Sequence, residues 1–194
     1  MSQPRRPVVL VCGIVWIAAV AAGLFGLQLY ESNPGTPAAA PSGWPPDCPL
    51  TREPGRPVLL MFAHPRCPCT AASIDELAHL MTHCQGRVKV HVLFVRPPGT
   101  PEGWEKAARW HQAAAIPGVH VAADIEAAEA RRFGAATSGQ VLLFGPDGQR
   151  LYSGGITAAR GHAGGNLGRQ AVLALIRGET AQPAQFPVFG CALD

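Results

Sequence analysis

The chain has 194 residues, of which 47% are hydrophobic and 15% charged, and its formal net charge is +3 at pH 7. This composition is typical of one folded domain with additional segments and excludes a wholly disordered chain. No run or stripe of lysine and arginine occurs along the sequence, which argues against a nucleic acid as partner.

The first element is an uncharged apolar stretch at residues 8–29. A helix of this length, rising about 1.5 Å per residue, spans a hydrocarbon core of about 30 Å. Arg5 and Arg6 precede it, and no basic residue follows until Arg52. The positive-inside rule then puts residues 1–7 in the cytoplasm and the rest on the periplasmic or extracytoplasmic side of the cytoplasmic (inner) membrane.

A cleaved signal peptide is the alternative interpretation of this stretch. Its apolar part is longer than the ~7–15 residues of a typical signal-peptide core, so we favour a retained, single-pass anchor. Residues 30–47 are rich in proline and alanine and predict an extended spacer between membrane and domain. The folded domain is expected at residues 48–194, with a C-terminal tail that contains a cysteine.

Strand and helix patterns alternate through this domain. Apolar or alternating patterns predict strands at 57–63, 88–95, 119–122 and 140–144, and a turn at 145–148 predicts a returning strand at 150–153. Helical patterns predict helices at 67–84, 102–115, 124–133 and 166–177, with Asp124 as an N-cap. A βαβ half followed by a ββα half predicts an α/β fold of three layers, with a central mixed sheet flanked by helices.

The segment with the clearest chemistry is His64-Pro65-Arg66-Cys67-Pro68-Cys69, between the first strand and the first helix of the domain. Pro68 suits the first helical position, which would make Cys67 the N-cap. The positive end of a helix stabilises a thiolate, and His64 and Arg66 could add positive charge. We therefore expect the Cys67 sulfur to be exposed, ionised and nucleophilic.

The segment from Leu59 to Leu80 resembles the active-site segment of the thioredoxin superfamily. Further motifs resemble its RedB-like branch: His64–Thr70, Ser153–Thr157, Arg160–His162 and Phe189–Cys191. The superfamily resemblance implies a thioredoxin-like fold, no cofactor, and either thiol–disulfide exchange or peroxide reduction. Cys67 and Cys69 match the catalytic cysteines, and protein thiols or disulfides, or peroxide, are the implied reactants.

Two features depart from the superfamily pattern. The spacing is Cys-x-Cys, and residues two apart on a helix point to different sides. A Cys67–Cys69 disulfide would therefore be strained and easily reduced. Ser138 and Gly139 stand where the superfamily usually has a cis-proline, and we expect their backbone to form the substrate-binding edge.

The roles of the remaining cysteines stay open from the sequence. Cys191 could resolve an oxidised Cys67, or it could clamp the tail to the domain through a disulfide, for example with Cys48. Cys84 is expected to be buried or clamped. The five cysteines beyond the apolar stretch are an odd number, so at least one is not paired within the chain.

The leading functional hypothesis is a membrane-anchored, extracytoplasmic thiol–disulfide oxidoreductase. One alternative is a peroxiredoxin-like thiol peroxidase that uses the same thiolate. Another is a Cu(I)-binding metallochaperone, because two thiolates with His64 or His162 would suit Cu(I). A scaffold without catalytic activity is the remaining alternative.

Overall fold

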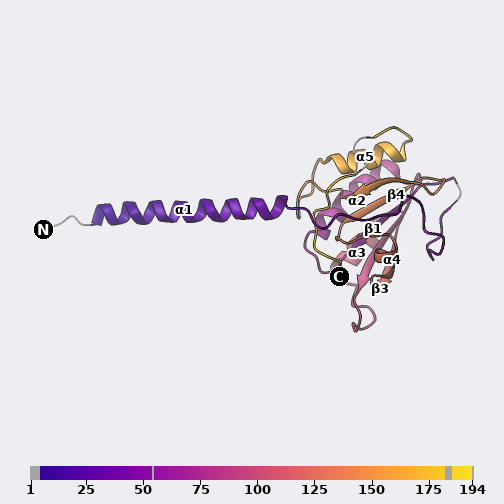
Figure 1. Cartoon of the computed structure of the whole chain (residues 1–194), viewed down its shortest axis with the longest axis horizontal. Helices are drawn as coiled ribbons and strands as arrows, with labels where there is room; N and C mark the ends of the chain where they lie inside the picture. The colour runs from indigo at the N-terminus through magenta and orange to yellow at the C-terminus, as the bar shows by residue number, and fades with distance from the viewer. Residues whose placement is uncertain (1–4, 54, 182–184, 194) are drawn as a thin grey trace. The chain divides into compact units, whose positions relative to one another are not determined.

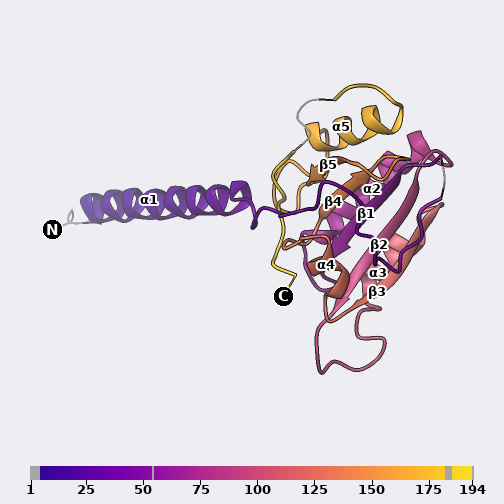
Figure 2. The same cartoon turned by 45° about the vertical axis from the view of Figure 1, so that its right-hand side comes forward.

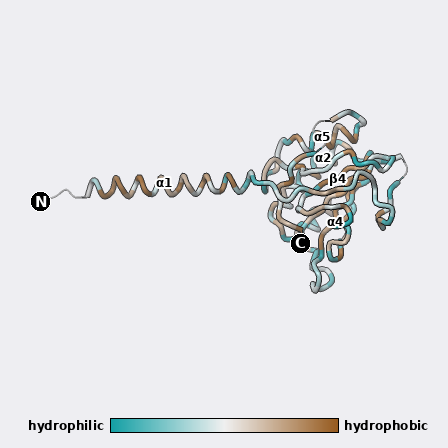
Figure 3. The backbone as a smooth tube through the Cα atoms, viewed as in Figure 1, coloured by the Kyte–Doolittle hydropathy of each residue, from teal (hydrophilic) through white to brown (hydrophobic). Residues whose placement is uncertain are grey.

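The computed structural model describes residues 5–53, 55–181 and 185–193. The chain divides into two compact units, Met1–Asn33 and Pro34–Asp194. The first unit holds helix α1, Arg5–Ser32, whose apolar character is visible along the tube in Figure 3. Among the described residues, Pro7–Ser32 is the one helix long and apolar enough to cross a membrane. Its length and composition fit the predicted span.

The domain begins earlier than the sequence predicts, because most of the expected spacer packs on it. The backbone N–H of Gly35 donates to the carbonyl of Val188 at 2.8 Å. The Trp44 ring meets Phe133 and Phe144 edge-on, with centroids 5.2 Å apart in both pairs. Apolar side chains in this proline-rich stretch gain more from covering the sheet than from facing water, so residues 34–47 do not form a free spacer.

The strands lie side by side in one sheet (Figure 2). Within the described residues they are β1 (Val58–Ala63), β2 (Lys89–Arg96), β3 (Val119–Ile125), β4 (Gln140–Phe144) and β5 (Arg150–Gly154). Their order in the sheet is β3-β2-β1-β4-β5. β1, β2 and β3 run parallel, whereas β4 is antiparallel to both β1 and β5. The mixed sheet expected from the sequence is confirmed.

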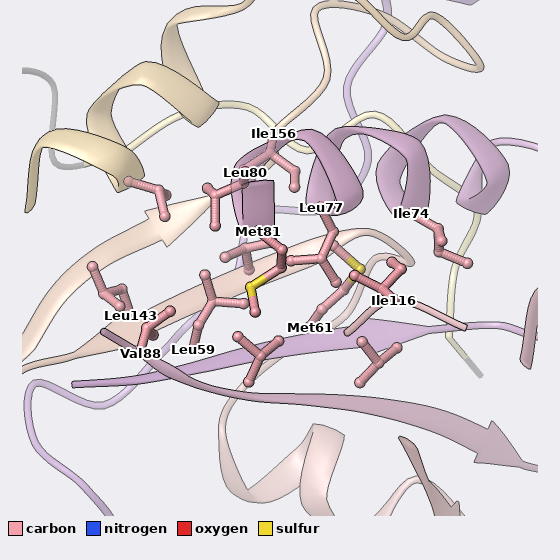
Figure 4. Packing of buried hydrophobic residues seen from close by; sticks show 14 of the residues in the cluster. Leu59, Met61, Ile74, Leu77, Leu80, Met81, Val88, Ile116, Leu143 and Ile156 are labelled. Carbon is pink, nitrogen blue, oxygen red and sulfur yellow. The ribbon is translucent and has the colours of Figure 1, made fainter. Parts of the chain in front are cut away.

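Helices cover both faces of this sheet (Figure 1). They are α2 (Thr70–Cys84), α3 (Ala108–Ala114), α4 (Ala128–Arg132) and α5 (Leu167–Ile176). Successive β1 side chains point to opposite faces, so Leu59 and Met61 join the core under α2, α3 and α5, while Leu60 and Phe62 join the core under α4. Figure 4 shows the first of these cores, in which Leu77 and Met81 of α2 lie over β1.

Helix α3 is shorter than the expected span of 102–115. Residues 101–107 form turns instead, and the helix begins only at Ala108. Trp110 packs on Phe94 of β2, with ring centroids 5.5 Å apart, as a core residue of α3 should. Trp104 lies in the turns and contacts the region between β1 and α2, so its assignment to the helix was wrong.

Helix α4 is also shorter, because Asp124 remains in β3. The chain then turns through Glu126 and Ala127, which both have φ of 55°. From the strand, the Asp124 carboxylate accepts hydrogen bonds from the backbone N–H groups of Glu129 and Ala130, each at 2.8 Å. Asp124 thus satisfies orphan donors of α4, as an N-cap would, from outside the helix.

Candidate functional site

The cysteine motif forms two consecutive turns between β1 and α2. The Cys67 N–H donates to the His64 carbonyl at 3.1 Å, and the Thr70 N–H donates to the Cys67 carbonyl at 3.3 Å. Helix α2 begins at Thr70, and Cys69 is its N-cap residue. The assignment of Cys67 as N-cap was therefore wrong, since turn hydrogen bonds occupy the segment where a helix start was expected.

Cys67 lies at the predicted junction, but its sulfur is covered. Its Sγ atom is 3.0 Å from Sγ of Cys191, a residue 124 positions later in the chain. Cys67 is 3% exposed and Cys69 is 6% exposed. The expectation of an exposed Cys67 thiol was wrong, because the C-terminal residues return to this place and cover it.

Residues 189–193, named here the tail, lie along the backbone of residues 136–138, named here the edge. The Ser138 N–H donates to the Cys191 carbonyl at 2.8 Å, and the Leu193 N–H donates to the Ala136 carbonyl at 3.1 Å. Between these bonds, Thr137 and Ala192 form an antiparallel bridge. The tail therefore pairs with the edge as a short added strand.

Hydrogen bonds fix the edge beside the cysteine turns. The Ser138 hydroxyl accepts from the His64 N–H at 2.8 Å and lies 2.8 Å from the Thr70 hydroxyl. The Gly139 N–H donates to the Phe62 carbonyl of β1 at 2.8 Å. Gly139 has φ of +91°, a conformation that favours glycine, which explains the residue found there.

The acidity of Cys67 reflects opposing effects. Burial raises its pKa, but hydrogen bonds from the thiol and backbone of Cys191 and from the hydroxyl and backbone of Thr70 lower it. The net result is a pKa below the usual value for a thiol. Donors that stabilise the charged form are the physical cause.

The pKa values of the two neighbouring thiols, Cys69 and Cys191, are raised. Burial, followed by the charge and hydrogen bonding of Cys67, raises the pKa of Cys69. Burial and the hydrogen bond with Cys67 raise the pKa of Cys191 to about 12. Arg160 acts against both shifts, and its guanidinium donates to the Gly190 carbonyl at the start of the tail. Of the three sulfurs, that of Cys67 is therefore the first to ionise as the pH rises.

Comparisons with known proteins bear on the fold. No family model matches the chain, and no curated protein matches it. A hypothetical protein from Sinorhizobium meliloti 1021 superposes with a TM-score of 0.61 and 22% identity, covering 84% of this chain and 96% of that one. An uncharacterised conserved protein from Geobacillus kaustophilus gives a TM-score of 0.59 and 17% identity, covering 84% and 92%.

The sheet order and the cysteine turns between β1 and α2 match the arrangement that the resemblance implies. The fold is thioredoxin-like. Membership of the RedB-like branch stays a prediction from sequence motifs.

His64 and Arg66 occupy the rim of this thioredoxin-like site but interact with Trp104. The His64 and Trp104 rings meet edge-on with centroids 5.7 Å apart, and the Arg66 guanidinium lies 4.4 Å from the centroid of the Trp104 ring. Burial and the charge of Arg66 lower the pKa of His64, which favours a neutral ring. His64 therefore does not supply the positive charge expected of it.

All six cysteines belong to the described residues, and all are free thiols. The Cys48 thiol donates to a Glu129 carboxylate oxygen at 3.5 Å, and burial raises its pKa to about 11. Burial likewise raises the pKa of Cys84 in α2 to about 11. Cys191 contacts Cys67, whereas Cys48 contacts Glu129. The fold therefore does not bring together the two cysteines of the alternative Cys48–Cys191 disulfide.

Among the described residues, three cysteines form a sulfur cluster that could hold a metal ion. The Sγ atoms of Cys67, Cys69 and Cys191 lie within 4.8 Å of one another. Thiolates of this kind suit soft ions such as Cu(I). The third ligand in the cluster is Cys191, whereas the sequence suggested His64 or His162.

Sequence reasoning missed two residues of the site. Thr70 was assigned only as a helical residue, although it directly follows the second cysteine. Arg160 was noted only as part of the Arg160–His162 motif, without a role, and His162 in the same motif is exposed. A cation close to buried sulfurs could have been suspected from chemistry, but no local pattern places Arg160 there.

Proposed function

We propose that the chain is a membrane-anchored thiol–disulfide oxidoreductase in which Cys67 is the nucleophile and Cys191 the resolving thiol. The observation that carries this proposal is the 3.0 Å contact between their sulfurs, beside donors that lower the pKa of Cys67. A thiolate within this distance of a second thiol has the arrangement needed to form and break a disulfide.

In the first step, the Cys67 thiolate attacks a disulfide of a partner protein. A bond forms between Cys67 and one partner sulfur, and the other partner sulfur leaves as a thiolate. The lowered pKa of Cys67 raises the fraction of nucleophile at neutral pH. The raised pKa of Cys69 keeps its thiol protonated, so Cys69 adds no second negative charge beside the Cys67 thiolate.

In the second step, Cys191 attacks the Cys67 sulfur of the mixed disulfide and releases the partner thiolate. Burial, the hydrogen bond with Cys67 and the charge of Cys67 all raise the pKa of Cys191 in the resting state. The last two effects disappear when Cys67 has entered a mixed disulfide and lost its charge. The resolving thiol thus becomes easier to deprotonate at the step that uses it.

Helix α1 would hold this domain at the membrane. Its apolar span and the arginines before it support an orientation with the N-terminus in the cytoplasm and the thiols on the extracytoplasmic side. Disulfides persist in such compartments, which would supply partner proteins with disulfides to exchange.

The test is the reduction of a disulfide-bonded protein such as insulin in the presence of dithiothreitol. Replacing the nucleophile by Cys67→Ser should lower the catalysed rate by about 10²-fold or more. Incubated with the disulfide-bonded protein after removal of dithiothreitol, the reduced Cys191→Ser chain should instead accumulate a mixed disulfide at Cys67, detectable by mass spectrometry. Cys48→Ser is the matched control and should retain activity, because its thiol lies outside the cluster. Full activity in Cys67→Ser would refute the proposal.

Peroxide reduction is the second candidate, favoured by the burial of Cys67. The sulfur of a residue that is 3% exposed can be reached by a small molecule more easily than by a protein. Peroxide would convert Cys67 to a sulfenic acid, and Cys191 would condense with it to a disulfide and release water. Rapid peroxide consumption that depends on Cys67, without exchange with protein disulfides, would support this candidate.

Binding of Cu(I) is a third candidate, favoured by the three sulfurs within 4.8 Å of one another. It requires all three cysteines to remain reduced. Titration of the reduced chain with Cu(I) against a chromogenic chelator, in parallel with the Cys191→Ser chain, tests it. Equal affinity of the two chains would exclude the three-sulfur site.

A further inference from the structure

The Cys67 sulfur is inaccessible to a protein substrate while the tail is paired with the edge. Cys67 and Cys69 are nearly fully buried, and the tail lies against them. The tail makes two backbone hydrogen bonds with the edge, so any extended segment could form the same two bonds. Only one segment can do so at a time.

The tail also delivers a sulfur to the position where a substrate sulfur would react. The bond from the Ser138 N–H to the Cys191 carbonyl sets the register of the tail. In that register, Sγ of Cys191 is 3.0 Å from Sγ of Cys67. The tail therefore occupies the edge as a substrate segment would.

The close approach of the tail to the edge restricts which residue type can stand directly before Cys191. A Cβ atom added to Gly190 would lie 1.9 Å from the Ser138 carbonyl oxygen. Backbone on the edge cannot move away easily, because Ser138 is also bonded to the turns around His64 and Thr70. A segment in the same register would need glycine at this position for the same reason.

Apolar side chains anchor the tail on both sides of its cysteine. Phe189, two positions before Cys191, is 8% exposed, and Leu193, two positions after it, is 2% exposed. Leu193 packs in the core on the α4 face of the sheet. These contacts describe the kind of segment that the edge accommodates.

We propose that the edge is a docking surface for an extended substrate segment in which glycine precedes the reactive cysteine and apolar residues lie two positions to either side, and that the tail is a built-in occupant which the substrate displaces. This inference rests on the proposed oxidoreductase function and specifies its substrate class.

A reduced chain exchanges with a substrate disulfide in two steps. The tail leaves the edge, the substrate segment pairs with it, and the Cys67 thiolate bonds to the substrate cysteine while the other substrate sulfur departs as a thiolate. Cys191 then loses its proton to water and attacks Cys67, and the tail returns as the substrate segment leaves with a free thiolate. Two electrons pass from the Cys67–Cys191 pair to the substrate disulfide.

The test uses the full-length Cys191→Ser chain and two synthetic peptides. One peptide has the sequence Val-Phe-Gly-Cys-Ala-Leu, the other has alanine in place of its glycine, and both carry nitrothiobenzoate on the cysteine as a mixed disulfide. Release of the coloured thiolate gives the rate, and mass spectrometry confirms the bond to Cys67. We expect the glycine peptide to react about tenfold faster or more, a factor that corresponds to about 1.4 kcal/mol.

A second variant displaces the occupant. Adding Gly190→Ala to the Cys191→Ser chain should loosen the tail and raise the rate with the glycine peptide several-fold. Gly165→Ala is the matched control, since a Cβ there meets nothing within 4 Å and should leave the rate unchanged. The comparison of the two peptides on the Cys191→Ser chain does not depend on how well Gly190→Ala folds.

Equal rates for the two peptides would overturn the docking proposal, as would a Gly190→Ala rate no higher than that of Gly165→Ala. The oxidoreductase function itself would be contradicted if Cys67 reacted neither with the peptides nor with the small disulfide formed by two nitrothiobenzoate molecules. The two failures are therefore distinguishable.

Discussion

Thr70 and Cys191 both direct hydrogen-bond donors at the Cys67 sulfur, and neither residue carries a positive charge. The basic residues of the motif play a smaller part than their sequence positions suggest. Arg66 lies over Trp104, and the pKa of His64 is lowered by burial. The reactivity of Cys67 is therefore set by short-range donors, one of which comes from the tail.

Removing the donor from residue 191 should raise the pKa of Cys67. A thiol with a lowered pKa becomes a thiolate at lower pH, so alkylation by iodoacetamide should reach half its maximal rate below pH 9.0, the ordinary value for a thiol. In Cys191→Ala this midpoint should move to higher pH. Cys191→Ser keeps a hydroxyl donor and should show a smaller shift. Identical pH profiles for the parent and both variants would show that the tail thiol does not stabilise the thiolate.

At the scale of elements, the central strands could be predicted closely from the sequence. β1 is a continuous apolar run, and β4 is apolar after Gln140; both strands are buried on both faces, and this pattern does not depend on the conformation of the turns. The helices were predicted in the right order, but α2, α3 and α4 begin later than expected. Trp104 leaves the helical pattern to contact His64, and Asp124 caps α4 while remaining in β3. Both deviations depend on contacts between elements.

The candidate site was predictable only in part, for a similar reason. A strand that runs into a Cys-Pro-Cys segment and then a helix is a local pattern, and the structure places Cys67 at that junction. The contact between Cys67 and Cys191 joins residues 124 positions apart. Local periodicity does not encode such a contact. The sequence left open whether Cys191 meets Cys67, and the pairing of the tail with the edge and the burial of the thiol became apparent only in the fold.

Glu76 of α2 ties together the elements around the site. Its side chain is 0% exposed, accepts a hydrogen bond from Asn166 at 3.0 Å, and pairs with Arg169 of α5 at 2.6 Å. Glu76→Ala should lower the free energy of unfolding by about 3 kcal/mol, because it leaves buried donors without their acceptor. Urea unfolding measures this loss. Asp75→Ala, at the exposed neighbouring position, should cost less than about 0.5 kcal/mol, and an equal effect of both variants would contradict the structural role of Glu76.

At the scale of the whole molecule, the segment between α1 and β1 belongs to the domain. The Trp44 N–H donates to the Gly148 carbonyl at 2.8 Å, and the Trp44 ring packs on two phenylalanines of the core. The segment therefore both follows α1 in the chain and completes one face of the sheet. A boundary chosen from proline content alone would remove this cover.

A chain of residues 34–194 should consequently be more stable than a chain of residues 48–194. The shorter chain loses two aromatic contacts and the apolar area under Trp44, which we expect to lower the free energy of unfolding by about 3 kcal/mol. Urea unfolding of both chains provides the comparison. Trp44→Ala in the longer chain should reproduce most of the loss. Equal stability of the two chains would mean that residues 34–47 contribute no packing energy.

The sequence separation between Cys67 and Cys191 has a consequence for durability. A covalent bond between these sulfurs would close a ring of about 124 residues, comprising most of the domain. Such a ring restricts the denatured chain and stabilises the folded state by up to about 5 kcal/mol. The oxidised protein would then resist heat and proteases better than the reduced protein, so its lifetime would depend on the supply of reductant.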